Sequence, residues 1–104
     1  MYLILWEYQV SFERAVEFEQ VYGSPGAWTA LFRNASGYLG TDLLHHASEP
    51  NRYMTIDRWI TAEAYAAFLA EWKKEYDELD VGCEGLTERE IPLGKWEAIP
   101  GETR

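Results

Sequence analysis

The spacing of apolar residues changes once inside the stretch Gly37–Leu79, and this change constrains the fold more than any other feature. Before Thr61 the stretch indicates two β-strands, Tyr38–His46 and Arg52–Ile60, joined by a five-residue link that contains proline and asparagine. After Thr61, a candidate helix N-cap, apolar residues recur every three or four positions at Tyr65, Phe68, Leu69, Trp72, Tyr76 and Leu79. The sequence therefore predicts a β-hairpin that leads directly into a long helix.

The residues before this stretch predict a strand and a broken helix. The strand Tyr2–Val10 is apolar on one face and half apolar on the other, which favours a central place in a sheet. The segment Phe12–Tyr22 is predicted to be helical, with an apolar stripe made of Phe12, Ala15, Val16, Phe18 and Tyr22. A second short helix is expected to start at Ser24 as N-cap and Pro25 as first helical residue.

The last element is a strand within Glu84–Ile99. Pro92 cannot donate a ladder hydrogen bond, so this strand is predicted to lie at a sheet edge with a bulge or kink. The whole order is β-α-β-β-α-β, which predicts an α+β, ferredoxin-like fold with a four-stranded antiparallel sheet and both helices on one face. We expect one domain over residues 1–104, with 1–99 folded and 100–104 forming a polar tail.

The sheet face without helices still carries apolar side chains on several strands. Such a face exceeds the apolar patch that a monomer normally exposes, so the sequence predicts a homodimer built on it.

Composition restricts the function classes. The chain has 18 acidic and 9 basic residues, a net charge of −9, which disfavours binding to nucleic acids and to anionic membranes. The only cysteine, Cys83, cannot form an internal disulfide, and the N-terminus lacks the basic region of a signal peptide, so a cytoplasmic location is expected. No spacing of His, Cys, Asp and Glu matches a metal site, and no metal or other cofactor is expected.

Several segments of the chain carry a resemblance to a known family. A strand that opens with Gly37-Tyr38 and the sequence Asp57-Arg58-Trp59 just before a helix are its clearest features. The supporting segments are Ile4–Val10, Phe18–Arg33, Gly37–Leu44 and Arg52–Phe68. The chain resembles the antibiotic biosynthesis monooxygenase domain family, within the dimeric α+β barrel superfamily.

The resemblance implies a homodimer whose sheets form a barrel, and a pocket in each monomer between sheet and helices. Relatives include cofactor-independent oxygenases of polycyclic aromatic substrates and haem-degrading enzymes. Active members use a strand Trp, which Trp59 matches, together with an Asn on the first strand and often a His on the last helix. This chain has Phe68 and Leu69 at the helix position, and no Asn along its first strand.

Trp59 and Asp57 are the leading site candidates. Trp59 lies at the end of a strand beside the aromatic helix face and is predicted either to stack on a planar ligand or to fill the core. Asp57 lies on the same strand face, where desolvation would raise its pKa and suit it to act as a general base. The alternative for Asp57 is an ion pair with an arginine such as Arg33, Arg52 or Arg58 of the dimer mate.

His45 is a third catalytic candidate, because one of the adjacent residues His45 and His46 is expected to face the pocket as an acid or base. The alternative is a hydrogen-bonded histidine at the rim. Ligand contacts are predicted for Trp28, Phe32, Tyr53, Trp59, Tyr65, Phe68 and Trp72.

Two functions follow from these residues. The first is a small cofactor-independent monooxygenase-like enzyme that acts on a planar, apolar and enolisable substrate. The second is a dimeric module that binds a small hydrophobic or aromatic molecule without turnover. A titratable group facing the pocket beside Trp59 would favour the enzyme.

Overall fold

A computed structural model describes residues 1–101 of the chain, so the last three residues of the predicted tail lie outside the described residues. The elements in chain order are β1 (Tyr2–Gln9), the 3-10 helix η1 (Phe12–Arg14), α1 (Ala15–Tyr22), α2 (Ala27–Phe32), β2 (Tyr38–His45), β3 (Arg52–Trp59), α3 (Ala62–Gly82) and β4 (Arg89–Glu97). None of the helices in these residues combines the length and apolar character needed to cross a bilayer.

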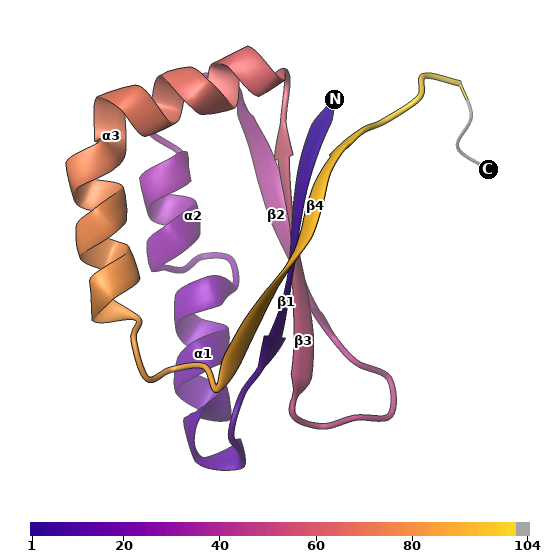
Figure 1. Cartoon of the computed structure of the whole chain (residues 1–104), viewed down its shortest axis with the longest axis vertical. Helices are drawn as coiled ribbons and strands as arrows, with labels where there is room; N and C mark the ends of the chain where they lie inside the picture. Colours follow the sequence, from indigo (N-terminus) through magenta and orange to yellow (C-terminus); the bar gives the residue numbers. More distant parts are fainter. Residues whose placement is uncertain (102–104) are drawn as a thin grey trace.

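The four strands form one antiparallel sheet in the order β2-β3-β1-β4. The three α-helices lie on one side of this sheet, as Figure 1 shows. This arrangement confirms the predicted α+β, ferredoxin-like fold. It also confirms the central place of β1, which pairs with β3 on one side and with β4 on the other.

The edge strand β4 carries the predicted irregularity. Leu5 of β1 pairs with Gly94, while the next residue, Trp6, pairs with Pro92, so Leu93 is an extra residue on the β4 side. Gly94 has φ of +99°, a left-handed conformation that side chains disfavour. Pro92 and Gly94 therefore flank the bulge of an edge strand, which is where strands tolerate proline and glycine.

The prediction of one continuous helix over Phe12–Tyr22, with Phe12 and Val16 on its buried face, is wrong. Residues 12–14 form a 3-10 turn, which completes a turn in three residues, and the α-helix starts only at Ala15. The apolar stripe expected for one continuous helix is therefore broken. Phe18 is fully buried, whereas Phe12 and Val16 are 91% and 71% exposed.

Side-chain hydrogen bonds mark the first residues of α2 and α3. α2 begins at Ala27 rather than at Pro25, because the Gly26 N–H donates to the Thr29 hydroxyl, 3.1 Å away. Thr61 is the N-cap of α3, as predicted, and its hydroxyl accepts from the Ala64 N–H at 3.1 Å. α3 then bends at Trp72, which has non-helical backbone angles (Figure 1).

The core between helices and sheet is aromatic. At one end Phe18 stacks on Tyr22 with ring centroids 4.4 Å apart, and both rings pack against Tyr8. At the other end Phe32 and Phe68 pack edge-on and tilted against Trp59. Pairs of this geometry add to the stability that apolar burial supplies.

Two phenylalanines six positions apart give a matched test of this core. We expect Phe18→Ala to lower the free energy of unfolding by about 3–5 kcal/mol, because it removes a fully buried ring from packed neighbours. Phe12→Ala should change it by no more than about 0.5 kcal/mol, because that ring is 91% exposed. Urea unfolding followed by circular dichroism measures both values. Equal losses in the two variants would contradict the observed burial of Phe18 and exposure of Phe12.

Candidate functional site

A cavity of about 190 Å³ lies between the helices and the sheet. All three α-helices and all four strands contribute to its wall. Its aromatic lining residues are Trp6, Tyr8, Tyr22, Trp28, Phe32 and Tyr76, and its polar ones are Thr41, Thr55, Asp57, Asp80 and Glu90. The cavity therefore has aromatic walls and a small number of polar groups, as ligand sites in proteins commonly do.

The bend in α3 divides this helix between core and cavity. Tyr65 and Phe68, which precede Trp72, pack against Trp59 in the core. Tyr76 and Asp80, which follow Trp72, line the cavity. Because α3 changes direction at Trp72, its first half packs in the core and its second half lines the cavity (Figure 1).

Asp57 is held in the cavity by a chain of hydroxyl groups. It faces Thr41 across the β2–β3 ladder, and the Thr41 hydroxyl donates to Asp57 Oδ1 at 2.7 Å. The Tyr38 hydroxyl lies 2.5 Å from Thr41 Oγ1. Since the single Thr41 proton is directed to Asp57, Tyr38 is the donor of this second bond. These two hydrogen-bonded hydroxyls fix one oxygen of the Asp57 carboxylate, and the other has no protein partner among the described residues.

The environment of Asp57 favours its protonated form. Burial raises the pKa of the Asp57 carboxyl from its ordinary 3.8 to about 6, and the hydrogen bond from Thr41 only partly offsets this. A carboxyl group with such a pKa is mostly ionised at neutral pH but is a stronger base than an exposed aspartate.

The phenol groups around Asp57 stay neutral. Burial, with the negative charge of Asp57 adding to it, raises the pKa of Tyr8 and of Tyr76 well above the ordinary range. Tyr8 shares a 3.0 Å hydrogen bond with Thr55. Neutral phenols beside a carboxylate can bind a ligand oxygen, but they cannot serve as bases near neutral pH.

The predicted site residues fall into two groups. Asp57, Trp28 and Phe32 line the cavity together. Trp59 has no exposed surface and packs behind Phe32, with ring centroids 5.7 Å apart. Four further predicted ligand contacts are also not among the residues lining this cavity, namely Tyr53, Tyr65, Phe68 and Trp72.

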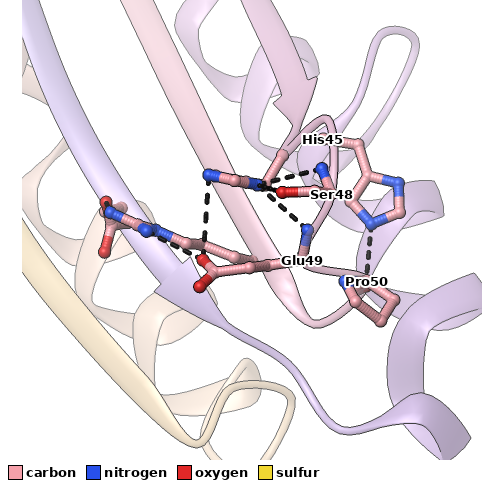
Figure 2. A network of polar contacts seen from close by, with 7 residues as sticks. His45, Ser48, Glu49 and Pro50 are labelled. Atoms are coloured by element: carbon pink, nitrogen blue, oxygen red, sulfur yellow. Dashed lines mark hydrogen bonds and ion pairs between the residues drawn. The ribbon is translucent and has the colours of Figure 1, made fainter.

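His45 is not brought together with Asp57. It lies at the far end of the β2–β3 hairpin, stacked on Tyr53 with centroids 4.4 Å apart. Its Nε2 is 2.7 Å from the Pro50 carbonyl oxygen, as Figure 2 shows. The neighbouring network in Figure 2, in which Ser48 and Glu49 donate backbone N–H groups to His46, closes the turn. His45 and His46 thus both interact within the hairpin, on the strand end away from the cavity.

Several cavity residues were not selected by the sequence analysis. Thr55 carries a detectable signal, because it alternates with Asp57 and must share its strand face. Thr41 becomes recognisable only when the hairpin register places it opposite Asp57. Asp80 and Glu90 carry no local signal, since one follows the bend of α3 and the other lies on an edge strand.

Haem iron requires an axial ligand, and the cavity residues do not fit that role. No histidine lines the cavity among the described residues. Its tyrosines are held neutral by burial, which raises their pKa and disfavours the phenolate that would bind iron. No group of three or more His, Cys, Asp and Glu residues within residues 1–101 is placed to hold a metal ion.

The fold and the cavity together define a ferredoxin-like α+β domain with a cavity between sheet and helices. The antibiotic biosynthesis monooxygenase family matches residues 1–71, and the chain belongs to this family. The resemblance predicted from the sequence is thereby confirmed. A comparison with curated protein sequences finds no match.

Solved structures with the same fold are distant in sequence. The chain is similar to SnoaB, a cofactor-independent oxygenase from Streptomyces nogalater, with 20% identity, a TM-score of 0.75 and coverage of 99% of this chain and 97% of SnoaB. PA3566 from Pseudomonas aeruginosa is 15% identical, with a TM-score of 0.70 and coverage of 94% and 93%. A variant of MhuD with two manganese protoporphyrin IX molecules bound per active site is 17% identical, with a TM-score of 0.66 and coverage of 95% of each chain.

The raised pKa of Asp57 predicts how stability depends on pH. Because the native state binds this proton more tightly than the unfolded chain, folding takes up a proton between about pH 4 and pH 6. The contribution of Asp57 to the free energy of unfolding therefore falls as pH rises through this window. Above it the carboxylate costs on the order of 2–3 kcal/mol.

We expect Asp57→Asn, which keeps the acceptor for Thr41 but carries no charge, to be more stable than the wild type at pH 8. Its advantage should shrink by about 1–1.5 kcal/mol at pH 5, where the native wild-type carboxyl is largely protonated. Urea unfolding of both proteins at the two pH values measures this difference, and the other titrating groups cancel. An advantage that does not change with pH would show that Asp57 is not destabilised by burial.

Proposed function

We propose that this chain is a cofactor-independent monooxygenase-like enzyme that acts on a planar, apolar and enolisable aromatic substrate in the cavity. The observation that carries this proposal is the Asp57 carboxylate, which lies within an aromatic-walled cavity and has a pKa of about 6. Membership of the antibiotic biosynthesis monooxygenase family and the likeness to a cofactor-independent oxygenase support it.

Asp57 acts as the general base in this proposal. It removes a proton from the activated C–H or O–H of the substrate, and the electron pair stays on the extended aromatic system as a carbanion or enolate. This anion gives its electrons to O2, and a C–O bond forms to give a peroxide anion, which takes back the proton held by Asp57 and becomes a hydroperoxide. Loss of water then breaks the O–O bond and the C–H bond on the same carbon, and leaves one oxygen atom in the product as a carbonyl group.

The remaining residues position the base and the substrate. The hydroxyls of Thr41 and Tyr38 hold one oxygen of Asp57, so the other is directed to the substrate. Trp28 and Phe32 provide flat apolar surface for the ring system. Trp59 contributes as a positioning residue, because its indole packs against Phe32 and supports the cavity wall from behind.

A binding module without turnover is the second candidate. The specific observation that favours it is that Asp57 is the only carboxylate of the cavity wall, among the described residues, that is largely buried, since Asp80 and Glu90 are exposed. Turnover would therefore require this one group both to remove the substrate proton and to return it. The cavity then holds its ligand through the same aromatic wall and the same hydroxyl groups.

Asp57→Asn separates the two functions. In the proposed enzyme this variant abolishes O2 consumption with enolisable aromatics such as anthrones, since an amide cannot accept the proton, while the ligand still quenches tryptophan fluorescence. Wild-type turnover should rise with pH and level off above an apparent pKa of about 6, where Asp57 is ionised. If the wild type binds a broad panel of such compounds and consumes no O2, the binding module replaces the enzyme.

We infer that the active form is a homodimer built on the sheet face opposite the helices. Residues that alternate with the cavity residues share this face, and they bring apolar neighbours together across the ladders: Leu5 with Ile56, Leu44 with Met54, and Leu3 with Trp96. Leu44 and Trp96 are 45% and 56% exposed in the single chain. A face with exposed or half-buried apolar side chains on all four strands favours a second copy of the chain in a two-fold arrangement.

Light scattering at micromolar concentration should give about twice the chain mass of 12.1 kDa. We expect Ile56→Lys to shift the protein to the monomer mass, because the ammonium group would have to be desolvated at the centre of the face. Val16→Lys makes the same change at a residue that is 71% exposed on the helical side, and should leave the dimer intact. A wild type that remains monomeric would rule out this arrangement.

A further inference from the structure

The charges in the cavity wall all have one sign. Three carboxylates line it, those of Asp57, Asp80 and Glu90, and no lysine, arginine or histidine is among its lining residues in the part of the chain that the structure describes. Site and surface agree in this respect, since the whole chain carries a net charge of −9. Such a wall repels carboxylates and phosphates and attracts cations.

The cationic groups nearest in sequence to Asp57 are engaged elsewhere. Arg58 pairs with Asp42 at 2.8 Å, on the opposite face of the sheet. Arg52 pairs with Glu7 at 2.8 Å, also on that face. The only hydrogen bond that the Asp57 carboxylate receives from residues 1–101 comes from the neutral hydroxyl of Thr41. The negative charge in the cavity thus has no positive partner within the described chain.

The aromatic walls suit a positive charge. The indole of Trp28 meets Tyr76 edge to face with ring centroids 5.0 Å apart, and Tyr22 lies 6.2 Å from the same indole. Tyr8 continues the series, 5.1 Å from Tyr22. These rings line one cavity, and an ammonium group is attracted to the faces of Trp and Tyr.

Two of the three carboxylates of the cavity wall are accessible to solvent. Asp80 and Glu90 are exposed, whereas Asp57 is only partly accessible. The Tyr22 hydroxyl donates to Glu90 at 3.4 Å, which places this carboxylate at the edge of the aromatic wall. The charge of Asp80 acts on Tyr76, with which it shares the last turns of α3. The outer pair therefore attracts a cation towards the deeper Asp57.

We propose that the cavity selects planar aromatic ligands that carry a protonated amine, and that Asp80, Glu90 and the surrounding aromatic faces bind its positive charge, while Asp57 adds to the negative potential. This inference rests on the proposed function for the existence of a ligand in this cavity and adds the chemical class of that ligand. The ammonium supplies the positive charge that the cavity wall lacks.

Three probes of one ring system and different charge test the proposal. These are 1-naphthylmethylammonium, neutral 1-naphthalenemethanol and anionic 1-naphthoate, each titrated against tryptophan fluorescence at low salt. We expect the ammonium to bind at least about tenfold more tightly than the alcohol, and the carboxylate to bind more weakly than the alcohol. The preference for the ammonium should fall at high salt, because the outer carboxylates are exposed and are screened.

Substitutions at the outer carboxylates locate the effect. Asp80→Asn and Glu90→Gln should each reduce the ammonium-to-alcohol ratio several-fold, and their thermal unfolding should match the wild type because both side chains are exposed. Asp77→Asn is the matched control on the same helix. It removes a carboxylate that pairs with Lys73 and is not part of the cavity wall, so the ratio should not change.

The possible results keep this inference apart from the proposed function. Equal binding of the three probes, or tightest binding of the carboxylate, overturns the selection of amines and leaves the cavity as a ligand site. An ammonium preference that Asp77→Asn reduces as much as Asp80→Asn overturns it as well, since overall charge would then be the cause. No binding of any probe counts against both the amine selection and the proposed use of this cavity.

Discussion

The packing of Phe32 between the core and the cavity is the contact on which the rest of the structure depends. On one side its ring meets Trp59 at 5.7 Å and Phe68 at 5.4 Å, and on the other it meets Trp28 at 5.8 Å. α2 has only six residues, far too few for a helix to be stable in isolation. Its position over the sheet therefore comes from these aromatic contacts, and the shape of the cavity follows from them.

Asp57 works against stability, and its surroundings explain why it can still be accommodated. Burial without a cationic partner raises the pKa of the Asp57 carboxyl, and at neutral pH its charge lowers the free energy of unfolding. The Thr41 hydroxyl lowers that cost without neutralising the charge, so the group keeps its basicity. Groups with strongly shifted pKa values are concentrated at functional sites of proteins. The hydroxyls of Thr41 and Tyr38 thus allow the folded core to hold a carboxyl group with a raised pKa.

Strand β3 joins the two surfaces of the protein that matter most. Thr55 and Asp57 point into the cavity, while Met54 and Ile56 point to the opposite face. Because side chains alternate along a strand, a shift of register by one residue would exchange the two sets. The ion pairs of Arg52 with Glu7 and Glu49 at the hairpin end help to hold the register that places Asp57 in the cavity. Cavity and proposed interface are therefore coupled through one backbone.

The sequence by itself determined the elements and their order. Period-two alternation placed Asp57 and Trp59 on one strand face, Thr61 marked the start of α3, and Pro92 marked an edge strand, because each signal acts within a few residues. Only the tertiary structure decided that Trp59 lies behind Phe32 rather than at the cavity surface. It also decided that the bend at Trp72 brings Tyr76 and Asp80 to the cavity. These outcomes depend on how rings from distant segments fill a shared volume, and local spacing contains no information about that volume.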